Sequence, residues 1–288
     1  MSEDTTLHNF IPEFWSKKLA PKFDDAGVMM KCVNRNYEGE IKNAGDKVHI
    51  QGIGDITVNS YTSDAITYQD LTSDQRDLEI DQKKYFAFAV PDIEKVQANV
   101  ELVDKYTAKA KKAIELAKDT FLLSKRTDVA SANILSDVSP TASNIYDTFV
   151  DLRTVLREAN AINQAGKAEN GKRPWVVVNP QIEKLIILSD EFTSRSTSAT
   201  DKLIRDGAIF EYAGFDVFSA TNLKKASGKI EILAGVDEAI TYASQITKIE
   251  ALRDKDHFQD LVRGLYVYGA KTVNNTLLAK VAFTGYSS

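Results

Sequence analysis

Alternating apolar and polar residues predict two strands between residues 37 and 90, joined by a long polar segment. The first half alternates at Val48, Ile50, Ile56 and Val58. The second half alternates at Leu78, Ile80, Phe86, Phe88 and Val90. Residues 59–77 between them are rich in Ser, Thr, Asp and Gln. We interpret the range as a long β-hairpin with a polar tip. It has too few large apolar residues for its own core, so it must lie on its own domain or on a neighbouring chain.

A single long helix is predicted directly after this hairpin, over residues 92–124. Pro91 and Asp92 suit a first helical turn. Apolar residues then recur three or four positions apart, with one gap, at Ile93, Val96, Val100, Val103, Ala110, Ile114, Ala117 and Phe121. Five lysines fall mostly off this stripe: Lys105, Lys109, Lys111, Lys112 and Lys118. At about 1.5 Å per residue the helix would be roughly 45–50 Å long, which suggests a mechanical spine.

Residues 144–243 indicate a compact α/β region. Asn144 is a candidate cap for a helix whose apolar face consists of Ile145, Phe149, Leu152, Leu156 and Ala159. A buried strand at 175–178 leads into Asn179 and Pro180, a cap followed by a first-turn proline. Two further elements are a short helix capped by Thr200 that stops at Gly207, and a hairpin that turns at Ala213-Gly214.

The two ends of the chain differ in character. Residues 1–36 are predicted to form an extended arm with short helical pieces, bounded by Pro12 and Pro21. The apolar stripe of this arm consists of Phe10, Ile11, Phe14, Trp15 and Leu19. The arm has little to pack against locally, so it needs a larger surface elsewhere. Residues 244–286 return to an alternating pattern that predicts two or three long strands.

Composition narrows the class of protein. The hydrophobic fraction of 43% and the charged fraction of 27% are ordinary for a globular protein. No apolar run approaches the roughly 20 residues that span a bilayer, and the N-terminus lacks a secretory signal pattern. A net charge of −5 disfavours dedicated nucleic-acid binding. Cys32 is the only cysteine, which excludes an internal disulfide and fits a reducing compartment.

The residue types that carry catalysis or bind metals do not cluster. The three histidines, His8, His49 and His257, are far apart and lack ligand-spaced neighbours. No nucleophile elbow, metalloprotease helix, paired-cysteine motif or phosphate-binding loop is present. Gly52 and Gly54 indicate a bulge or a turn rather than a dinucleotide site. We therefore predict no catalytic residue, no metal site and no cofactor.

Acidic pairs and tyrosines are the remaining candidates for chemistry. Two carboxylate pairs, Asp24-Asp25 and Asp254 with Asp256, are interpreted as solvated surface. Three tyrosines lack the interleaved basic residues that stacking on nucleic-acid bases requires. We expect them to pack at an interface; they are Tyr61, Tyr68 and Tyr85.

Taken in order, five stretches resemble the major capsid proteins of tailed double-stranded-DNA bacteriophages, which share the Johnson fold. The first strand and tip of that family's extended loop resemble DKVHIQGIGDITVNSYT (46–62). Its return strand and spine helix resemble LEIDQKKYFAFAVPDIEKVQ (78–97). Its axial domain resembles RPWVVVNPQIEKLII (173–187) and GAIFEYAGFDVFSATNL (207–223). Its peripheral strands resemble AITYASQITKIEALRDKDHFQDLVRGLYVYGAKTV (239–273).

The resemblance implies an α+β fold in five parts. These are an N-terminal arm (1–36), an extended β-hairpin loop (37–90), a spine helix and peripheral domain (91–143), an axial domain (144–243) and peripheral-domain strands (244–288). It implies a structural protein, not an enzyme, that self-assembles into the icosahedral head shell around packaged phage DNA.

The resemblance also implies partners and a location. Copies of the chain would form hexamers and pentamers in the virion capsid, assembled in the cytoplasm of the host bacterium. DNA would be enclosed without sequence-specific binding, and no membrane would be involved. The hairpin begins near residue 37, so we expect the family's cleavable scaffolding segment to be absent or already removed, and Met1 favours its absence. A separate scaffolding protein and a portal are the expected partners.

Six residues are candidate contacts between copies: Phe14, Trp15, Tyr61, Tyr68, Leu71 and Arg76. Some family members cross-link a hairpin lysine to an asparagine of another copy. Four residues have the right types but do not match that motif, so we interpret them as ordinary surface: Lys83, Lys84, Asn274 and Asn275. Two other functions stay open, a shell protein of a cellular nanocompartment with the same fold and a soluble α/β enzyme with a dispersed site.

Overall fold

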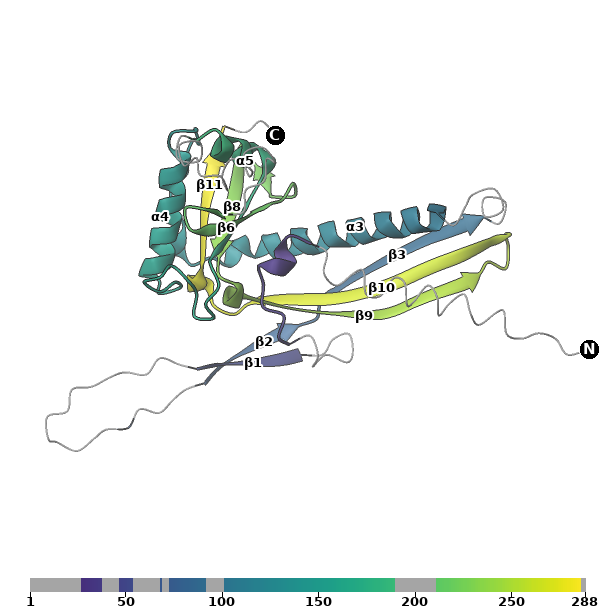
Figure 1. Cartoon of the computed structure of the whole chain (residues 1–288). Coiled ribbons are helices and arrows are strands. Elements are labelled where there is room, and N and C mark those ends of the chain that lie inside the picture. Colours follow the sequence, from purple (N-terminus) through teal and green to yellow (C-terminus); the bar gives the residue numbers. More distant parts are fainter. Residues whose placement is uncertain are drawn as a thin grey trace, which may run out of the picture.

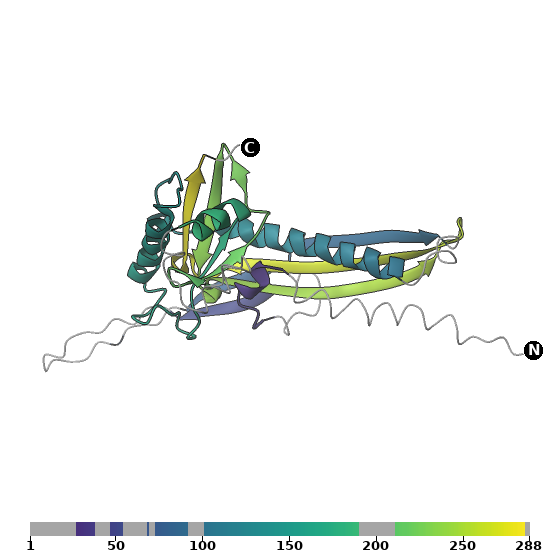
Figure 2. The ribbon, with the colours of Figure 1, turned by 45° about the horizontal axis from the view of Figure 1, so that its top comes forward.

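The computed structural model describes residues 27–37, 47–53, 68, 73–91, 101–189 and 211–285. They form an α+β fold with two main parts, which we call the body and the spine (Figure 1). The body is a six-stranded sheet with helices α4 and α5. The spine is helix α3 with a three-stranded sheet, and both extend side by side away from the body (Figures 1 and 2).

The sheet of the body has the strand order β11-β8-β4-β6-β5, with β7 paired to β8. Only β4 and β6 are parallel; the other described pairs are antiparallel. The strands are β4 (Trp175–Val178), β5 (Glu211–Tyr212), β6 (Phe215–Ser219), β7 (Lys225–Ala226), β8 (Lys229–Gly235) and β11 (Leu278–Thr284). Helices α4 (Ile145–Glu158) and α5 (Pro180–Ile187) cover one face.

Both faces of this sheet are buried at β4, which explains why this strand consists of consecutive apolar residues. Val176 and Val178 pack beneath the two helices. Trp175 and Val177 pack on the other side, in a core shared with the spine. The apolar face expected for α4 is confirmed at four positions, which are Ile145, Phe149, Leu152 and Leu156.

Two of the caps and turns predicted for the body are confirmed, and one is wrong. The Asn179 side chain accepts the Ile182 N–H at 2.9 Å, so the predicted cap of α5 is confirmed. The turn at Ala213-Gly214 is also confirmed, and both residues have a positive φ, as a two-residue hairpin requires. Asn144 precedes α4 but does not cap it with its side chain, which instead accepts the Thr141 N–H at 2.7 Å. The helix expected from Thr200 to Gly207 lies outside the described residues.

The spine combines α3 (Glu101–Ser124) with strands β3 (Gln82–Pro91), β9 (Ile240–Arg253) and β10 (Gln259–Thr272). The strand order is β3-β10-β9, and all pairs are antiparallel. The 24 described residues of α3 correspond to about 36 Å. Residues 92–100 of the predicted helix lie outside the described residues.

Lys118 is an exception to the expected pattern, in which the helix lysines lie mostly off the apolar stripe. Its side chain is fully buried between α3 and the sheet. The ammonium group donates a hydrogen bond to the Tyr266 hydroxyl at 3.3 Å and lies 4.8 Å from the centre of the same ring. A buried lysine needs such partners because it has left water.

The last strand of the chain belongs to the body and not to the spine. We expected residues 244–288 to be peripheral strands, but β11 pairs with β8 and forms an edge of the six-stranded sheet. Residues 134 and 138 also form isolated bridges to β11, at Lys280 and Phe283. In addition, β9 begins at Ile240, within the range assigned to the axial domain. Periodicity identified these strands but could not assign them to a sheet.

The predicted hairpin of residues 37–90 does not include residues 82–90, because 82–91 is a strand of the spine. Strand β1 (Lys47–Ile53) pairs with β2 (Ser73–Glu79), in a register that runs from Lys47 opposite Glu79 to Ile53 opposite Ser73. The next strand, β3, leaves the hairpin and pairs with β10. Gly52 lies within β1 opposite Asp74, so the expected bulge or turn is wrong at that position.

The end of the predicted arm is part of the core. Met29 and Cys32 are fully buried, and Met30 and Val33 nearly so. The short 3-10 helix Met29–Lys31 packs on α3, and Asn34 bridges to β9 at Thr241. The expectation that the arm has little to pack against locally is therefore wrong for residues 27–36, and the rest of the arm lies outside the described residues.

Candidate functional site

The three-stranded sheet has one covered face and one open face. Even-numbered residues of β3 point toward α3, where Phe88 stacks on Tyr106 with ring centres 6.0 Å apart. Odd-numbered residues point away, and Tyr85 and Ala87 are exposed there. Tyr85 keeps 80% of its surface accessible. Together with its apolar neighbours, this exposed aromatic side chain makes the outer face a candidate contact surface.

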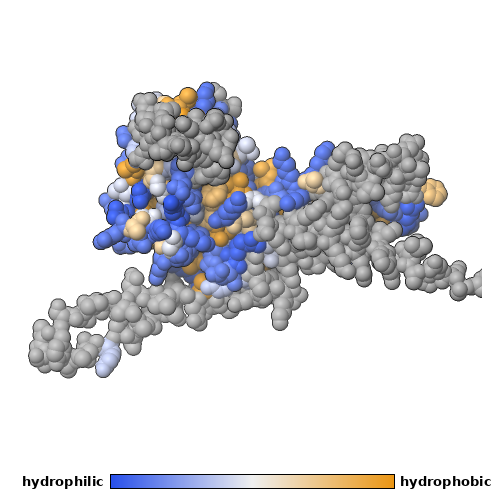
Figure 3. Space-filling model, viewed as in Figure 1, coloured by the Kyte–Doolittle hydropathy of each residue, from blue (hydrophilic) through white to orange (hydrophobic). Residues whose placement is uncertain are grey.

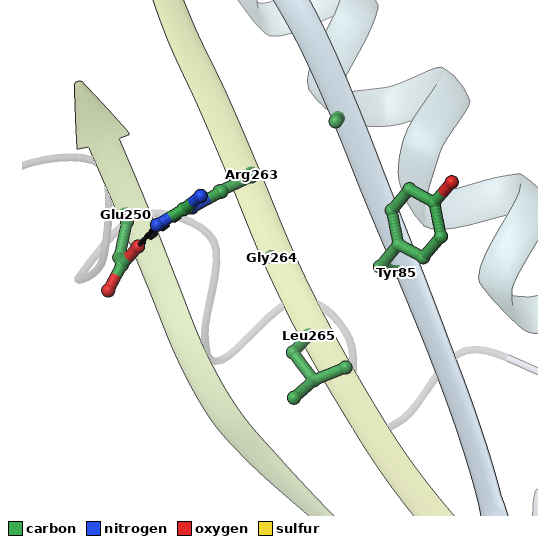
Figure 4. A pocket seen from close by; sticks show the side chains of 6 residues that line it. Tyr85, Glu250, Arg263, Gly264 and Leu265 are labelled. Carbon is green, nitrogen blue, oxygen red and sulfur yellow. Dashed lines mark hydrogen bonds and ion pairs between the residues drawn. The ribbon is translucent and has the colours of Figure 1, made fainter.

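We call this surface the outer sheet face and define it by Tyr85, Ala87, Arg263 and Leu265 (Figure 4). It contains a shallow hollow of about 470 Å³. Tyr85 and Leu265 lie on either side of Gly264, whose backbone forms part of the floor. Arg263 is held by Glu250 through two hydrogen bonds, the longer of them 2.7 Å. The surface is thus apolar in the middle, with a paired charge at its edge, which is the usual anatomy of a protein interface.

A second open surface lies between α3 and β3, and we call it the helix groove. Its volume is about 510 Å³. Leu116 is 51% exposed and forms part of the floor, while Lys84 and Thr120 contribute polar groups. The groove also reaches Tyr268, whose buried hydroxyl has no hydrogen-bond partner among the described residues. An unpaired buried hydroxyl is costly, so this atom favours a partner that supplies the missing bond.

Burial raises the pKa of Tyr268, and the charge of Asp81 raises it further. The hydroxyl therefore keeps its proton at neutral pH. It is available to donate a hydrogen bond to a carbonyl or carboxylate oxygen in the helix groove.

The base of the hairpin, where β1 and β2 meet the spine, is packed into a small apolar core. Leu78 is fully buried, and Ile50 and Ile80 nearly so, against Val267 of β10 and Ala243 of β9. Gly269 of β10 lets the backbones touch, because a Cβ there would lie 2.1 Å from the carbonyl oxygen of Glu79. This packing fixes the direction in which β1 and β2 leave the spine.

The six predicted contact residues fall into two groups. Phe14, Trp15, Tyr61 and Leu71 lie outside the described residues. Tyr68 is described and is 91% exposed. Arg76 lies on β2 and lines a polar hollow of about 520 Å³ together with Lys125 and Lys271. The structure therefore leaves all six as predictions.

Sequence reasoning missed several exposed apolar residues. Phe258 is 85% exposed at the turn between β9 and β10, and Leu265 lies on the outer sheet face. Leu116 was missed because it falls off the apolar stripe of α3. Such residues give no signal beyond being apolar at a position where the local pattern calls for a polar one.

A buried carboxylate ties the end of the arm to the spine. Asp119 of α3 accepts the backbone N–H groups of Val28 and Met29, each at 3.0 Å. Its burial raises the pKa of the carboxyl group, while these two hydrogen bonds and Lys118 oppose the shift. Because the first effect is larger, the folded chain binds this proton more tightly than the unfolded chain does.

We expect the stability of the wild-type chain, relative to Asp119→Asn, to rise as pH falls. The contribution of proton binding is fully present below the pKa of Asp119 in the unfolded chain, and it is lost as pH rises through the higher folded pKa. Asparagine does not titrate, so the difference between the two proteins removes the effects of other carboxylates. Urea unfolding of both, from about pH 7 to about pH 4, measures it. A difference that stays flat or decreases toward acid pH would contradict the assignment.

The described part of the chain offers little for catalysis. No group of three or more His, Cys, Asp or Glu side chains suited to a metal ion occurs there. The turn at 254–257 holds Asp254 and His257, whose carboxylate and ring nitrogen are 3.4 Å apart on the surface. Among the same residues, no helix has the length and hydropathy to cross a membrane.

Comparisons with known proteins provide the remaining evidence. No family model matches the chain, and no curated protein does. A chain from a structure of Mycobacterium phage Che8 is 30% identical, with a TM-score of 0.69 over 90% of this chain and 91% of that one. The capsid of Ralstonia phage GP4 matches at 11% identity and a TM-score of 0.64, over 88% of this chain and 87% of that one. The SrpI encapsulin of Synechococcus elongatus matches at 12% identity and a TM-score of 0.59, over 94% and 91%.

Proposed function

Because the chain belongs to the phage major capsid proteins of the Johnson fold, we propose that its shell is the icosahedral head that encloses packaged double-stranded DNA. Proteins of this family assemble into multimeric shells from copies of themselves, and their role is structural. We extend that role to this chain and assign it no enzymatic activity.

One observation carries the proposal: in the described part of one copy, the spine presents two accessible surfaces. The outer sheet face and the helix groove lie on opposite sides of the three-stranded sheet, and both are partly apolar. Rings of five or six copies need head-to-tail contacts, in which different surfaces of one chain meet. Two different open surfaces on one rigid element suit such contacts.

The hairpin provides a third contact in this proposal. Its base is buried on its own spine, through Leu78 and Ile80, so its strands leave the spine in a fixed direction. We assign the outer part of the hairpin, with Tyr68 and Leu71, to the helix groove of a neighbouring copy. Carbonyl oxygens of an extended segment would accept the hydrogen bond that the Tyr268 hydroxyl lacks among the described residues. Many weak contacts of this kind give a stable shell, because each forms at a high effective concentration.

The remaining partners follow from charge and from the family. A net charge of −5 suits a shell that encloses DNA without binding its phosphate groups tightly. We propose a separate scaffolding protein and a portal as assembly partners, and assembly in the cytoplasm of the host bacterium. Hexamers and pentamers of the chain would form the shell.

A cellular nanocompartment is the second candidate function. The match to an encapsulin supports it, but at 12% identity that match shows the fold alone. The phage chain at 30% identity favours the first function. The contents of purified particles separate the two, since a nanocompartment would hold a cargo protein and no DNA.

Electron microscopy of the expressed full-length chain tests the proposal. Cells should produce it with its neighbouring head genes and, in parallel, without them. We expect closed icosahedral particles in the first case, with nuclease-resistant DNA in particles recovered from infected cells. A chain that stays monomeric in both cases at high concentration would overturn the assembly function, and particles with only a protein cargo would favour the nanocompartment.

A further inference from the structure

Helix α4 carries two pairs of opposite charges on opposite flanks. Asp147 and Asp151 are four residues apart, as are Arg153 and Arg157, so each pair lies on one side of the helix. At 3.6 residues per turn, the two pairs point well apart around the helix axis. The buried face of α4 separates them on the inside, while Val150 and Thr154 separate them on the outside. One chain cannot bring its own two pairs together.

Two glycine turns hold the guanidinium group of Arg153 in place. A Cβ on Gly166 would lie 2.0 Å from Nη2 of Arg153, and a Cβ on Gly214 would lie 2.7 Å from its Cζ. Both glycines have a positive φ, of 73° and 84°. The head of this side chain therefore lies against the loop after α4 and the turn between β5 and β6, where only glycine leaves room for it.

This ordered guanidinium group is left without a partner in the described part of the chain. Arg153 makes no hydrogen bond or ion pair with any described residue, although its side chain is partly buried. Arg157, one turn further on, donates to the Gln164 carbonyl at 3.2 Å and so lies over the same loop. A guanidinium group has five N–H donors in a planar arrangement that matches a carboxylate. Holding one in a fixed position lowers the entropy cost of binding such a group.

The acidic pair of α4 also lacks an ion-pair partner among the described residues. Asp147 and Asp151 are exposed, and neither forms an ion pair with a described residue. Helix α4 lies at the outer edge of the body, away from the spine (Figure 1). Hydrophilic residues cover much of the described surface in that region (Figure 3), which suits contact through charge more than through apolar burial.

We propose that Arg153, supported by Arg157, binds the Asp147–Asp151 pair of the adjacent copy, so that α4 is a head-to-tail contact within a ring of copies. The inference rests on the proposed function and adds the residues that join one body to the next. Each chain carries both the basic and the acidic half of the contact. Every copy in a closed ring therefore binds one neighbour through its arginines and the other through its aspartates. Such charge pairs set the register and exclude mispaired orientations, since like charges would then face each other.

Charge reversal tests the contact, with particle yield as the readout. Three full-length variants are produced beside the wild type, with the neighbouring head genes: Arg153→Glu, the double change Asp147→Arg with Asp151→Arg, and a combined variant that carries these three changes together with Arg157→Glu. We expect the first two to lower the yield of shells at least about tenfold, because the lost contact recurs at each position of a ring. The combined variant restores opposite charges across the contact and should recover most of the yield.

The matched control is Lys224→Glu, which changes the net charge as Arg153→Glu does. Lys224 is exposed on the body and forms no ion pair with a described residue, so this variant should assemble as the wild type does. Thermal unfolding of each unassembled chain shows whether the fold is intact. Normal assembly by Arg153→Glu, or a combined variant that stays as defective as the single one, would overturn the contact. Failure of the wild type itself to form shells would instead overturn the proposed function.

Discussion

A chain in which Asn-Gly replaces residues 54–72 is expected to fold normally and to form no shells. Ile53 and Ser73 face each other at the end of the β1–β2 pair, and a two-residue Asn-Gly turn is the common way to join such strands. The removed segment includes Tyr68, which is 91% exposed and contributes nothing to the core of its own chain. The buried base, with Leu78 and Ile80, stays intact.

The measurement is particle yield by electron microscopy, together with the melting temperature of the unassembled chain. We expect the yield to fall by about two orders of magnitude or more, because each copy loses one of its contacts and rings multiply that loss. The melting temperature should stay within a few degrees of the wild type, since shorter loops cost little entropy to close. A Gly/Ser segment of the original length is the control for spacing alone. Wild-type numbers of normal-sized shells from the shortened chain would show that the hairpin is not an assembly contact.

Gly269→Ala is expected to destabilise the fold strongly, because the added methyl group would collide with the backbone of a neighbouring strand. The new Cβ would lie 2.1 Å from the Glu79 oxygen, and 3.0 Å from both the Glu79 carbonyl carbon and the Ile80 Cα. All three atoms belong to the backbone, so β2 and β10 would have to separate. We expect the free energy of unfolding to fall by about 2–4 kcal/mol, as for overpacked cores.

Gly264→Ala is the matched control, on the same strand. Its Cβ would also be too close, at 2.4 Å, but to the far end of the Phe86 side chain, which can rotate away. Neither glycine has a positive φ, so backbone strain does not distinguish the two variants. Urea unfolding should therefore show a loss for Gly264→Ala of less than half that for Gly269→Ala. Equal losses, or a larger loss for Gly264→Ala, would mean that β2 is not held against β10 as described.

Local signals worked where one stretch of chain contains both the cause and the effect. Asn179 caps α5 because its side chain reaches an N–H three residues away. Ala213-Gly214 turns because two adjacent residues take a positive φ. The stripe of α3 follows from its own period, and the position of Ile114 in the core is confirmed. The interaction surfaces were less accessible, because Leu116 and Leu265 are recognised as exposed only when their neighbours in space are known.

From the sequence we could predict a long helix, strands before and after it and an α/β region, and the order of these segments resembles that of a shell family. Four features emerged only from the folded chain: β11 joins the body, β3 leaves the hairpin, the end of the arm enters the core through Met29 and Cys32, and Lys118 is buried. These features depend on contacts between residues far apart in the sequence. Periodicity and caps act within a few residues, whereas sheet partners such as β8 and β11 are brought together only by the packing of the whole chain.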